Sequence, residues 1–194
     1  RVWLSKQEEE GYYYGFANQG LWPLCHVAYT RPNFNLSDWK TYKAVNKKFA
    51  DVVLKEVGDR NAFVFIQDYH FALLSNYLKD RPNIRTAQFW HTPWPNPEVF
   101  RVCPWREEMI DGLLGNDLLG FHIRRHCLNF MDAVDRMLEG IEAGSFYIVC
   151  PDDEVSEEED RRRILWGAGD ITEDRPALSR WDPTVEHAYH TFKP

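Results

Sequence analysis

The stretch Ile84-Arg-Thr-Ala-Gln-Phe-Trp90, followed at once by His91-Thr-Pro-Trp-Pro-Asn-Pro-Glu-Val-Phe100, decides the fold. Its first part is typical of a β-strand of mixed polarity, and its second part is a loop braced by proline and tryptophan. A strand that opens into such a loop holds a polar side chain at the carboxyl edge of an α/β sheet, where ligands bind. His91 is the side chain presented there.

Strands and helices are predicted to alternate on either side of this stretch. Residues 62–67 form a nearly continuous apolar strand, 117–121 a short strand and 145–150 a candidate last strand. Helical periodicity is predicted for residues 38–57 with Ser37 as the cap, and then for 71–78, 106–114 and 122–138. This order predicts an α/β fold with a Rossmann-like, doubly wound parallel sheet.

The division of the chain follows from its composition. Residues 1–150 are predicted to form the Rossmann-like domain. Residues 151–194 form an acidic and basic tail, in which residues 152–160 hold seven acidic side chains before Arg161-Arg-Arg163. Low hydrophobicity and segregated charge are typical of a solvated or disordered stretch.

Charge and cysteine content limit the function classes. The net charge of −7 argues against a nucleic-acid or anionic-membrane partner, and no apolar run reaches membrane-spanning length. The cysteines Cys25, Cys103, Cys127 and Cys150 lack CxxC pairing, which indicates buried reduced thiols in a cytoplasmic protein. The sequence starts at Arg1 rather than at Met, so we expect the natural start to have been removed.

Several side chains could do chemistry, and each has a structural alternative. Asp68 and His70 directly follow a strand and could bind hydroxyl groups, or Asp68 could merely cap the next helix and His70 be a buried donor. His91 could be functional or a core histidine, and its place after the next strand along the chain favours function. His122 and His126 have an i, i+4 spacing, but no third ligand is evident, so a solvated helix face is favoured over a metal site.

An aromatic block near the N-terminus adds two candidates. Tyr12-Tyr-Tyr-Gly-Phe-Ala-Asn-Gln-Gly-Leu-Trp-Pro23 lacks a clean helical or strand period, which predicts a functional loop entering a short helix. Tyr13 and Trp22 could stack on or hydrogen-bond a sugar ring, or they could be ordinary core aromatics.

Four blocks together resemble one family, the trehalose-6-phosphate synthases (glycosyltransferase family 20), which are retaining GT-B enzymes with two Rossmann-like domains. The blocks are the segments at residues 12–26, Asp68-Tyr-His70, Phe89-Trp-His-Thr-Pro-Trp-Pro95, and Gly112-Leu-Leu-Gly-Asn-Asp-Leu-Leu-Gly-Phe-His122 with Cys127-Leu-Asn-Phe130. They occur in order and at family-like spacing over about residues 8–140. The resemblance implies that this chain is the acceptor-binding half of a GT-B architecture.

The resemblance also implies an activity and roles for four residues. It implies transfer of glucose, with retention, from a nucleotide sugar to glucose 6-phosphate, giving trehalose 6-phosphate; UDP-glucose is the expected donor, and the sequence leaves the donor base (uracil, adenine or guanine) open. By the resemblance, Tyr13 and Trp22 line the acceptor site, Asp68 holds acceptor hydroxyls and His91 lies near the donor glucose. The implied front-face mechanism has no protein nucleophile, metal or cofactor, and a homo-oligomer is left open.

The sequence departs from the family pattern, and two alternatives stay open, the first because the aromatic lining suits either acceptor and the second because half of the catalytic residues are not found. The family's Gly-rich loop would precede Arg1, and the donor-binding motifs are not found in residues 141–194, so we expect this chain alone not to turn over substrate. Thr92 and Ser75 also replace an aliphatic residue and a proline. The alternatives are a glucosylglycerol-phosphate synthase, which uses glycerol 3-phosphate, and a non-catalytic subunit that senses sugar phosphates.

Overall fold

The computed structural model describes residues 1–142, 157–173, 184 and 186–192. The chain divides into two compact units, Arg1–Ser145 and Phe146–Pro194, and each is taken by itself below. The predicted last strand at 145–150 and Cys150 lie outside the described residues.

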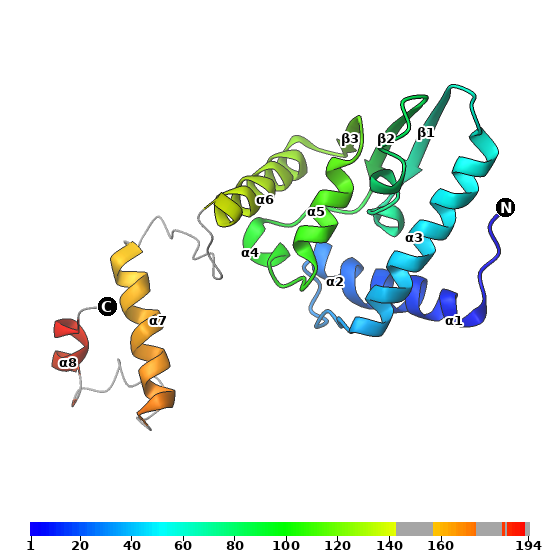
Figure 1. The fold of residues 1–194 in the computed structure, drawn as a ribbon. Helices are drawn as coiled ribbons and strands as arrows, with labels where there is room; N and C mark the ends of the chain where they lie inside the picture. The colour runs from blue at the N-terminus through cyan, green and yellow to red at the C-terminus, as the bar shows by residue number, and fades with distance from the viewer. Residues whose placement is uncertain (143–156, 174–183, 185, 193–194) are drawn as a thin grey trace. The chain divides into compact units, whose positions relative to one another are not determined.

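Unit 1 is built on a parallel sheet. Strands β1 (Ala62–Gln67), β2 (Ile84–Trp90) and β3 (Leu118–Phe121) lie in the order β1-β2-β3, side by side in Figure 1. Gln67 pairs with Phe89, and Phe89 pairs with Gly120, so the three strands end close together at one edge. The prediction of a Rossmann-like parallel α/β sheet is confirmed.

Helix α3 (Leu36–Val57) packs against one face of this sheet. Its Ala50 belongs to a buried cluster with Ile66 of β1 and with Leu74 and Leu78. Asn35, not the predicted Ser37, caps α3, because its Oδ1 accepts the Asp38 N–H at 2.9 Å and the helix starts at Leu36.

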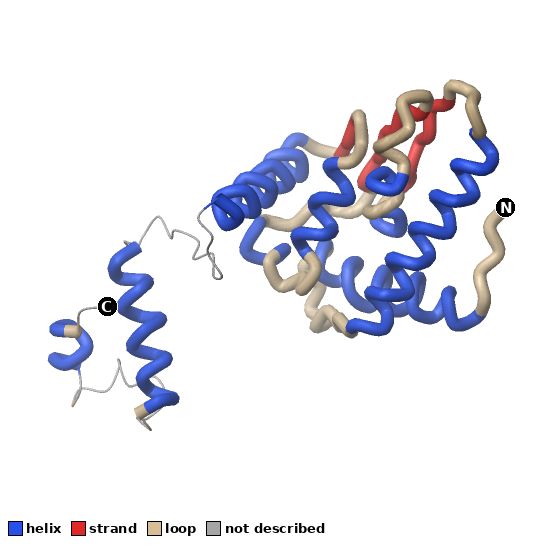
Figure 2. The backbone as a smooth tube through the Cα atoms, in the orientation of Figure 1, coloured by secondary structure: helices blue, strands red, loops and turns tan. Residues whose placement is uncertain are grey.

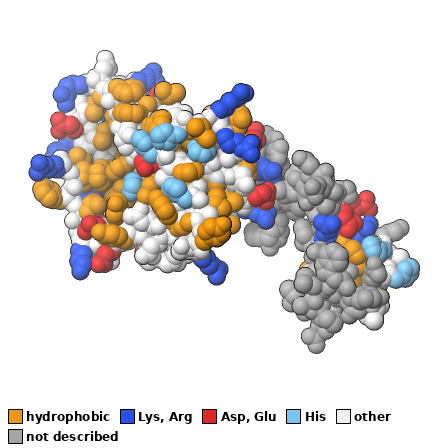
Figure 3. Space-filling view, turned by 180° about the vertical axis from the view of Figure 1, so that it is seen from behind, with side chains coloured by type: hydrophobic (Ala, Val, Ile, Leu, Met, Phe, Trp, Pro, Cys, Tyr) orange, Lys and Arg blue, Asp and Glu red, His pale blue; other side chains and the backbone are white. Residues whose placement is uncertain are grey.

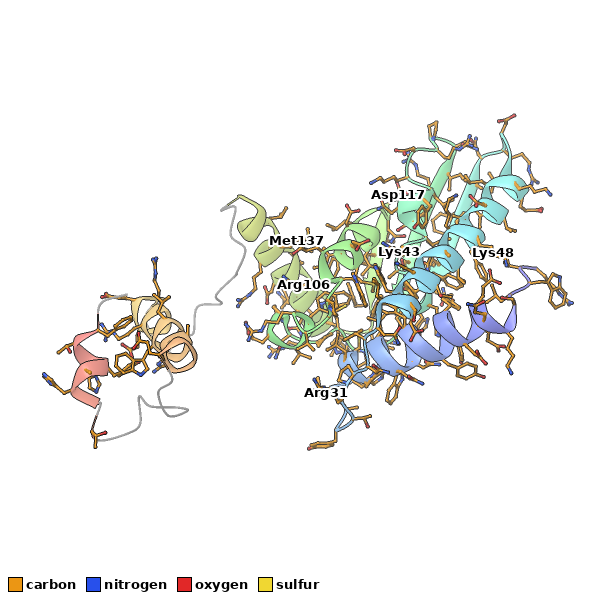
Figure 4. The ribbon with its side chains drawn as sticks, turned by 60° about the horizontal axis from the view of Figure 1, so that its bottom comes forward. Arg31, Lys43, Lys48, Arg106, Asp117 and Met137 are labelled. Carbon is orange, nitrogen blue, oxygen red and sulfur yellow. The ribbon has the colours of Figure 1, made fainter. Side chains whose placement is uncertain are left out.

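Ion pairs join α3 to two other helices. Lys48 pairs with Glu8 of α1 (Lys6–Glu9) at 2.9 Å, and Lys43 pairs with Glu108 of α5 (Arg106–Leu114) at 2.9 Å. Figure 4 labels both lysines on α3. Since all four side chains are partly exposed, these pairs orient the helices more than they stabilise them.

The aromatic block predicted as a loop is helical. Residues 6–25 run without interruption through α1, the π-helix η1 (Glu10–Leu21) and α2 (Trp22–Cys25), as Figure 2 shows. The buried positions of η1 recur every four to five residues (Gly11 and Tyr12, Gly15 to Ala17, Gly20 and Leu21). A π-helix closes i→i+5 hydrogen bonds, so its apolar residues do not follow the period of an α-helix.

The segment after β1 is not the predicted helix at 71–78. It forms two 3₁₀ turns, η2 (Tyr69–Phe71) and η3 (Ser75–Tyr77). Side chains of α3 bind its backbone between the turns: the Ala72 N–H donates to Tyr42 Oη at 3.0 Å, and the Leu73 N–H to Asn46 Oδ1 at 3.2 Å. These tertiary bonds take the place of a regular helical ladder.

The remaining helices of unit 1 complete the core. They are α4 (Pro97–Phe100) and α6 (Arg124–Glu142), and Phe130 of α6 packs on Trp94 with ring centroids 4.9 Å apart. Strand β1 is less buried than its apolar sequence predicts, because Phe63 and Phe65 are 68% and 60% exposed on the sheet face opposite Ile66. Cys25 and Cys103 are buried free thiols as predicted, whereas Cys127 is exposed.

Unit 2 contains two helices in its described part, α7 (Glu157–Thr172) and α8 (Glu186–Thr191). The charged stretch is helical from residue 157 onward, and residues 152–156 lie outside the described residues. Buried Trp166 and Tyr189 meet edge to face at 5.5 Å, and Tyr189 Oη donates to Glu159 Oε1 at 2.6 Å. An aromatic contact and a charge-assisted hydrogen bond thus link α7 to α8.

Substitution of Gly112 tests how closely α5 approaches the 3₁₀ segment. A Cβ atom there would lie 2.5 Å from the Ala72 carbonyl oxygen and 2.6 Å from Leu73 Cδ2. We expect Gly112→Ala to lower the free energy of unfolding by about 1–3 kcal/mol, measured by urea denaturation. Helix propensity alone favours alanine by about 1 kcal/mol, so a more stable variant would contradict the close approach.

Candidate functional site

Asp68 and His91 meet at the carboxyl edge of the sheet. Asp68 follows β1 and His91 follows β2, and the Asp68 N–H donates to the Phe89 carbonyl at 2.8 Å. Asp68 Oδ1 accepts the main-chain N–H groups of His91 at 3.0 Å and Thr92 at 3.3 Å. One carboxylate oxygen therefore holds the loop after β2, and the side chain of Asp68 makes no helix-cap hydrogen bond.

The backbone of Asp68 is strained. Its φ of 65° and ψ of −177° lie in a region that almost only glycine adopts. In this conformation the Asp68 side chain accepts hydrogen bonds from two backbone amides of the loop after β2, and these bonds offset part of the strain. Strain of this kind gathers at functional sites, which supports Asp68 as a site residue.

This strain predicts an order of stabilities. Asp68→Ala and Asp68→Gly both lose the carboxylate, but only glycine adopts the observed φ and ψ without strain. We expect the glycine variant to be more stable than the alanine variant by about 1 kcal/mol, the strain relief less the entropy cost of glycine. Urea unfolding of the two variants measures this difference, and equal stabilities would show that position 68 carries no strain.

The His91 ring is exposed and makes defined contacts. Its Nε2 lies 2.7 Å from Gln67 Oε1, and its ring meets Phe89 at 4.6 Å and His122 at 5.4 Å, edge to face in both cases. With Nε2 donating to Gln67, Nδ1 is the ring nitrogen that can accept a hydrogen bond. Figure 3 shows histidine side chains gathered on one face of unit 1, with an acidic side chain among them.

Tyr13 is linked to this edge of the sheet by its contact with His70. The two rings stack with centroids 5.3 Å apart and an interplanar angle of 12°, which brings η1 to the turn that follows Asp68. Burial lowers the pKa of His70, with Asp68 opposing the shift, so its ring is neutral near pH 7. Tyr13 is 40% exposed, and its ring also meets Tyr14 edge to face at 5.2 Å.

The ring contact of Trp22 is with His26 and not with the other three candidates. It is 44% exposed and its ring stacks on His26 at 4.2 Å, while the His26 Nδ1 lies 2.8 Å from the Trp22 carbonyl oxygen. Within the part of the chain that the structure describes, no hydrogen bond or ring contact joins Trp22 to Asp68 or His91. The structure therefore brings Asp68 and His91 together and ties Tyr13 to them, but it does not tie Trp22.

His122 and His126 do not share a helix face. Helix α6 starts at Arg124, so His122 precedes it, and His126 has its pKa lowered by burial and by His122. Across residues 1–142, 157–173, 184 and 186–192, no group of three or more His, Cys, Asp or Glu side chains could hold a metal ion. None of the helices described there is long and apolar enough to cross a membrane.

Two neighbours of the site were missed or undervalued from sequence. Gln67 is the last residue of β1 and binds His91, and Thr92 is buried with its side chain within hydrogen-bond reach of the Cys25 thiol. A polar residue ending an apolar strand was the available signal for Gln67. Thr92 offered only its departure from the family's usual aliphatic residue.

A parallel α/β sheet with a carboxylate and an imidazole at its carboxyl edge is characteristic of Rossmann-like domains, a class that binds ligands at that edge. Residues 1–178 match the family model "Glycosyltransferase family 20", and the chain belongs to that family.

Curated relatives and solved structures agree with this assignment. The chain is 37% identical over 144 residues to an alpha,alpha-trehalose-phosphate synthase [UDP-forming] of Pichia angusta (71% of this chain, 30% of the relative). It is 40% identical over 134 residues to a glucosylglycerol-phosphate synthase of Pseudomonas anguilliseptica (69% and 18%). The chain thus spans less than a third of the length of these relatives.

Two solved structures are similar to unit 1. "Trehalose-6-phosphate from E. coli bound with UDP-2-fluoro glucose" matches with a TM-score of 0.65 and 33% identity, over 69% of this chain and 30% of that one. The alpha,alpha-trehalose-phosphate synthase (UDP-forming) from Burkholderia xenovorans in complex with glucose-6-phosphate matches with a TM-score of 0.64 and 26% identity (68% and 29%).

Proposed function

We propose that this chain supplies the acceptor-binding half of a retaining glucosyltransferase that moves glucose from UDP-glucose to glucose 6-phosphate, giving trehalose 6-phosphate. The observation that carries the proposal is the Asp68 carboxylate at the carboxyl edge of the sheet. Its Oδ1 is used by two backbone amides, which leaves Oδ2 to accept hydrogen bonds from sugar hydroxyls. The relatives named for this reaction support the donor and acceptor.

The proposed chemistry needs placement more than acid–base power. The bond between the anomeric carbon and the UDP oxygen breaks, an acceptor hydroxyl oxygen bonds to that carbon on the same face, and the departing diphosphate takes the proton. No metal or other cofactor is assigned. Asp68 would orient the acceptor and His91 would lie beside the donor glucose, which lowers the entropic barrier of the transfer.

Glycerol 3-phosphate is the alternative acceptor, since a glucosylglycerol-phosphate synthase is 40% identical over the matched residues. Both acceptors offer hydroxyl groups and a phosphate to the same carboxylate and tyrosine. The contacts around Asp68 therefore do not distinguish the two acceptors, and the proposal for glucose 6-phosphate draws on the trehalose-phosphate synthase relatives.

The experiment measures UDP release from UDP-glucose by the full-length gene product, with glucose 6-phosphate and with glycerol 3-phosphate in turn. The proposal expects turnover with glucose 6-phosphate and a product identified by mass as trehalose 6-phosphate. Turnover with glycerol 3-phosphate alone would assign the alternative. Glucose 6-phosphate binding measured by calorimetry without turnover would indicate a sensing subunit instead.

A further inference from the structure

The His70 ring lies among three tyrosines from two elements. It stacks on Tyr13 at 5.3 Å and on Tyr69 at 4.1 Å, and the ring of Tyr12 is tilted against it at 6.2 Å. Tyr12 and Tyr13 belong to η1, whereas Tyr69 and His70 belong to η2. The imidazole therefore fills the space between the N-terminal helical run and the turn after β1.

The turn that carries His70 is held on both sides. Asn46 of α3 donates from Nδ2 to the His70 carbonyl at 3.2 Å, and Tyr69 Oη donates to Asn18 Oδ1 of η1 at 2.8 Å. Burial and nearby Asp68 raise the pKa of Tyr69 to about 12, so its hydroxyl stays a donor. Because its backbone and its neighbour are both bound, the His70 ring is a fixed surface for Tyr13.

One ring nitrogen of His70 makes no hydrogen bond within the described residues. This nitrogen, Nε2, is buried. Such orphaned atoms are rare in folded proteins and call for an explanation. The His70 ring stacks on Tyr13 at an interplanar angle of 12°, while its buried Nε2 makes no hydrogen bond in the part of the chain that the structure describes. The ring therefore acts on its surroundings through its stacking face.

We infer that His70 is a positioning residue for the acceptor, acting through Tyr13. Its face fixes the Tyr13 ring, so that the phenol hydroxyl keeps a constant place relative to Asp68, which lies two residues before His70 on the same turn. One short turn thus sets both acceptor contacts at once. This inference rests on the proposed function, because it takes Tyr13 and Asp68 as acceptor-binding residues.

The test compares three variants of the full-length gene product. His70→Phe keeps a flat ring, His70→Leu keeps side-chain volume without one, and His70→Ala removes both. We expect the leucine and alanine variants to raise the glucose 6-phosphate Kd and KM by about 3- to 10-fold, the range for a lost aromatic pair. The kcat should change less, and phenylalanine should restore Kd and KM to within about twofold.

A double-mutant cycle separates positioning from a general structural role. In a Tyr13→Leu background, His70→Leu should raise the Kd for glucose 6-phosphate no further, because its effect passes through the missing ring. Additive effects of the two changes would overturn the inference. A phenylalanine variant as weak as alanine would also overturn it, since an imidazole nitrogen would then be required.

Urea midpoints show which variants are folded. If His70→Ala does not fold, the glucose 6-phosphate Kd values of His70→Leu and His70→Phe still test the role of the ring. Failure of the wild-type protein to bind glucose 6-phosphate would reject the proposed function. Normal wild-type binding with an unchanged His70→Leu variant would reject only the role of His70.

Discussion

Asp68→Asn in the full-length gene product should lower kcat/KM for glucose 6-phosphate by about 10- to 150-fold, the cost of one hydrogen bond to a charged group. The amide keeps an oxygen that can accept the N–H groups of His91 and Thr92, so the loop after β2 stays in place. What changes is the second oxygen, which becomes an NH₂ donor and no longer accepts a sugar hydroxyl.

The UDP-release assay gives the kinetic effect, and urea unfolding shows that the asparagine variant folds as the wild type does. Asp132→Asn is the matched control, because Asp132 is an exposed carboxylate of α6 outside the site. It should leave kcat/KM within about twofold of the wild type, as surface substitutions do. An Asp68→Asn variant with near-normal turnover would remove Asp68 from the acceptor site.

His91→Ala should lower kcat by about 100-fold with little change in stability. Removing one preorganised polar group from a transfer site costs roughly 10²- to 10³-fold in kcat. Stability should be retained because the imidazole is exposed, and the hydrogen bond that fixes this position comes from the main-chain N–H, which alanine keeps.

The same assay and the urea midpoint check this prediction, with His187→Ala as the control. His187 is an exposed histidine of α8 in unit 2, and its replacement should leave kcat unchanged. If His91→Ala turns over substrate within about threefold of the wild type, the ring of His91 has no part in the transfer, whatever its place at the sheet edge.

The strands were the most predictable part of the fold. An apolar run at 62–67 and the stretch at 84–90 are local signals, and the observed β1 and β2 have the predicted bounds. The predictions of a loop at the aromatic block and of a helix after β1 were wrong, because neither segment forms regular α-helical hydrogen bonds. The π-helix η1 has a longer period than an α-helix, and the N–H groups of Ala72 and Leu73 are bound by α3 side chains rather than by a helix of their own.

The residues of the site could be named from the order of the chain, because a side chain that follows a parallel strand must lie at the carboxyl edge. That rule placed Asp68 and His91 at one edge, and the resemblance of four sequence blocks to a known family indicated the family of the chain. The contacts between the site residues were decided by tertiary structure. These contacts are the hydrogen bonds from His91 and Thr92 to the Asp68 carboxylate and the stacking of Tyr13 on His70. The positive φ of Asp68 was also decided by tertiary structure.

The physical reason is the separation of the partners along the chain. Asp68 and His91 are 23 residues apart, and Tyr69 and Asn18 are 51 residues apart, so no local propensity encodes their hydrogen bonds. The first bond forms only when β1 pairs with β2, and the second only when η1 packs against the turn after β1. Residue order therefore determines which side chains share the sheet edge, and tertiary packing determines the hydrogen bonds and ring contacts that each of them makes there.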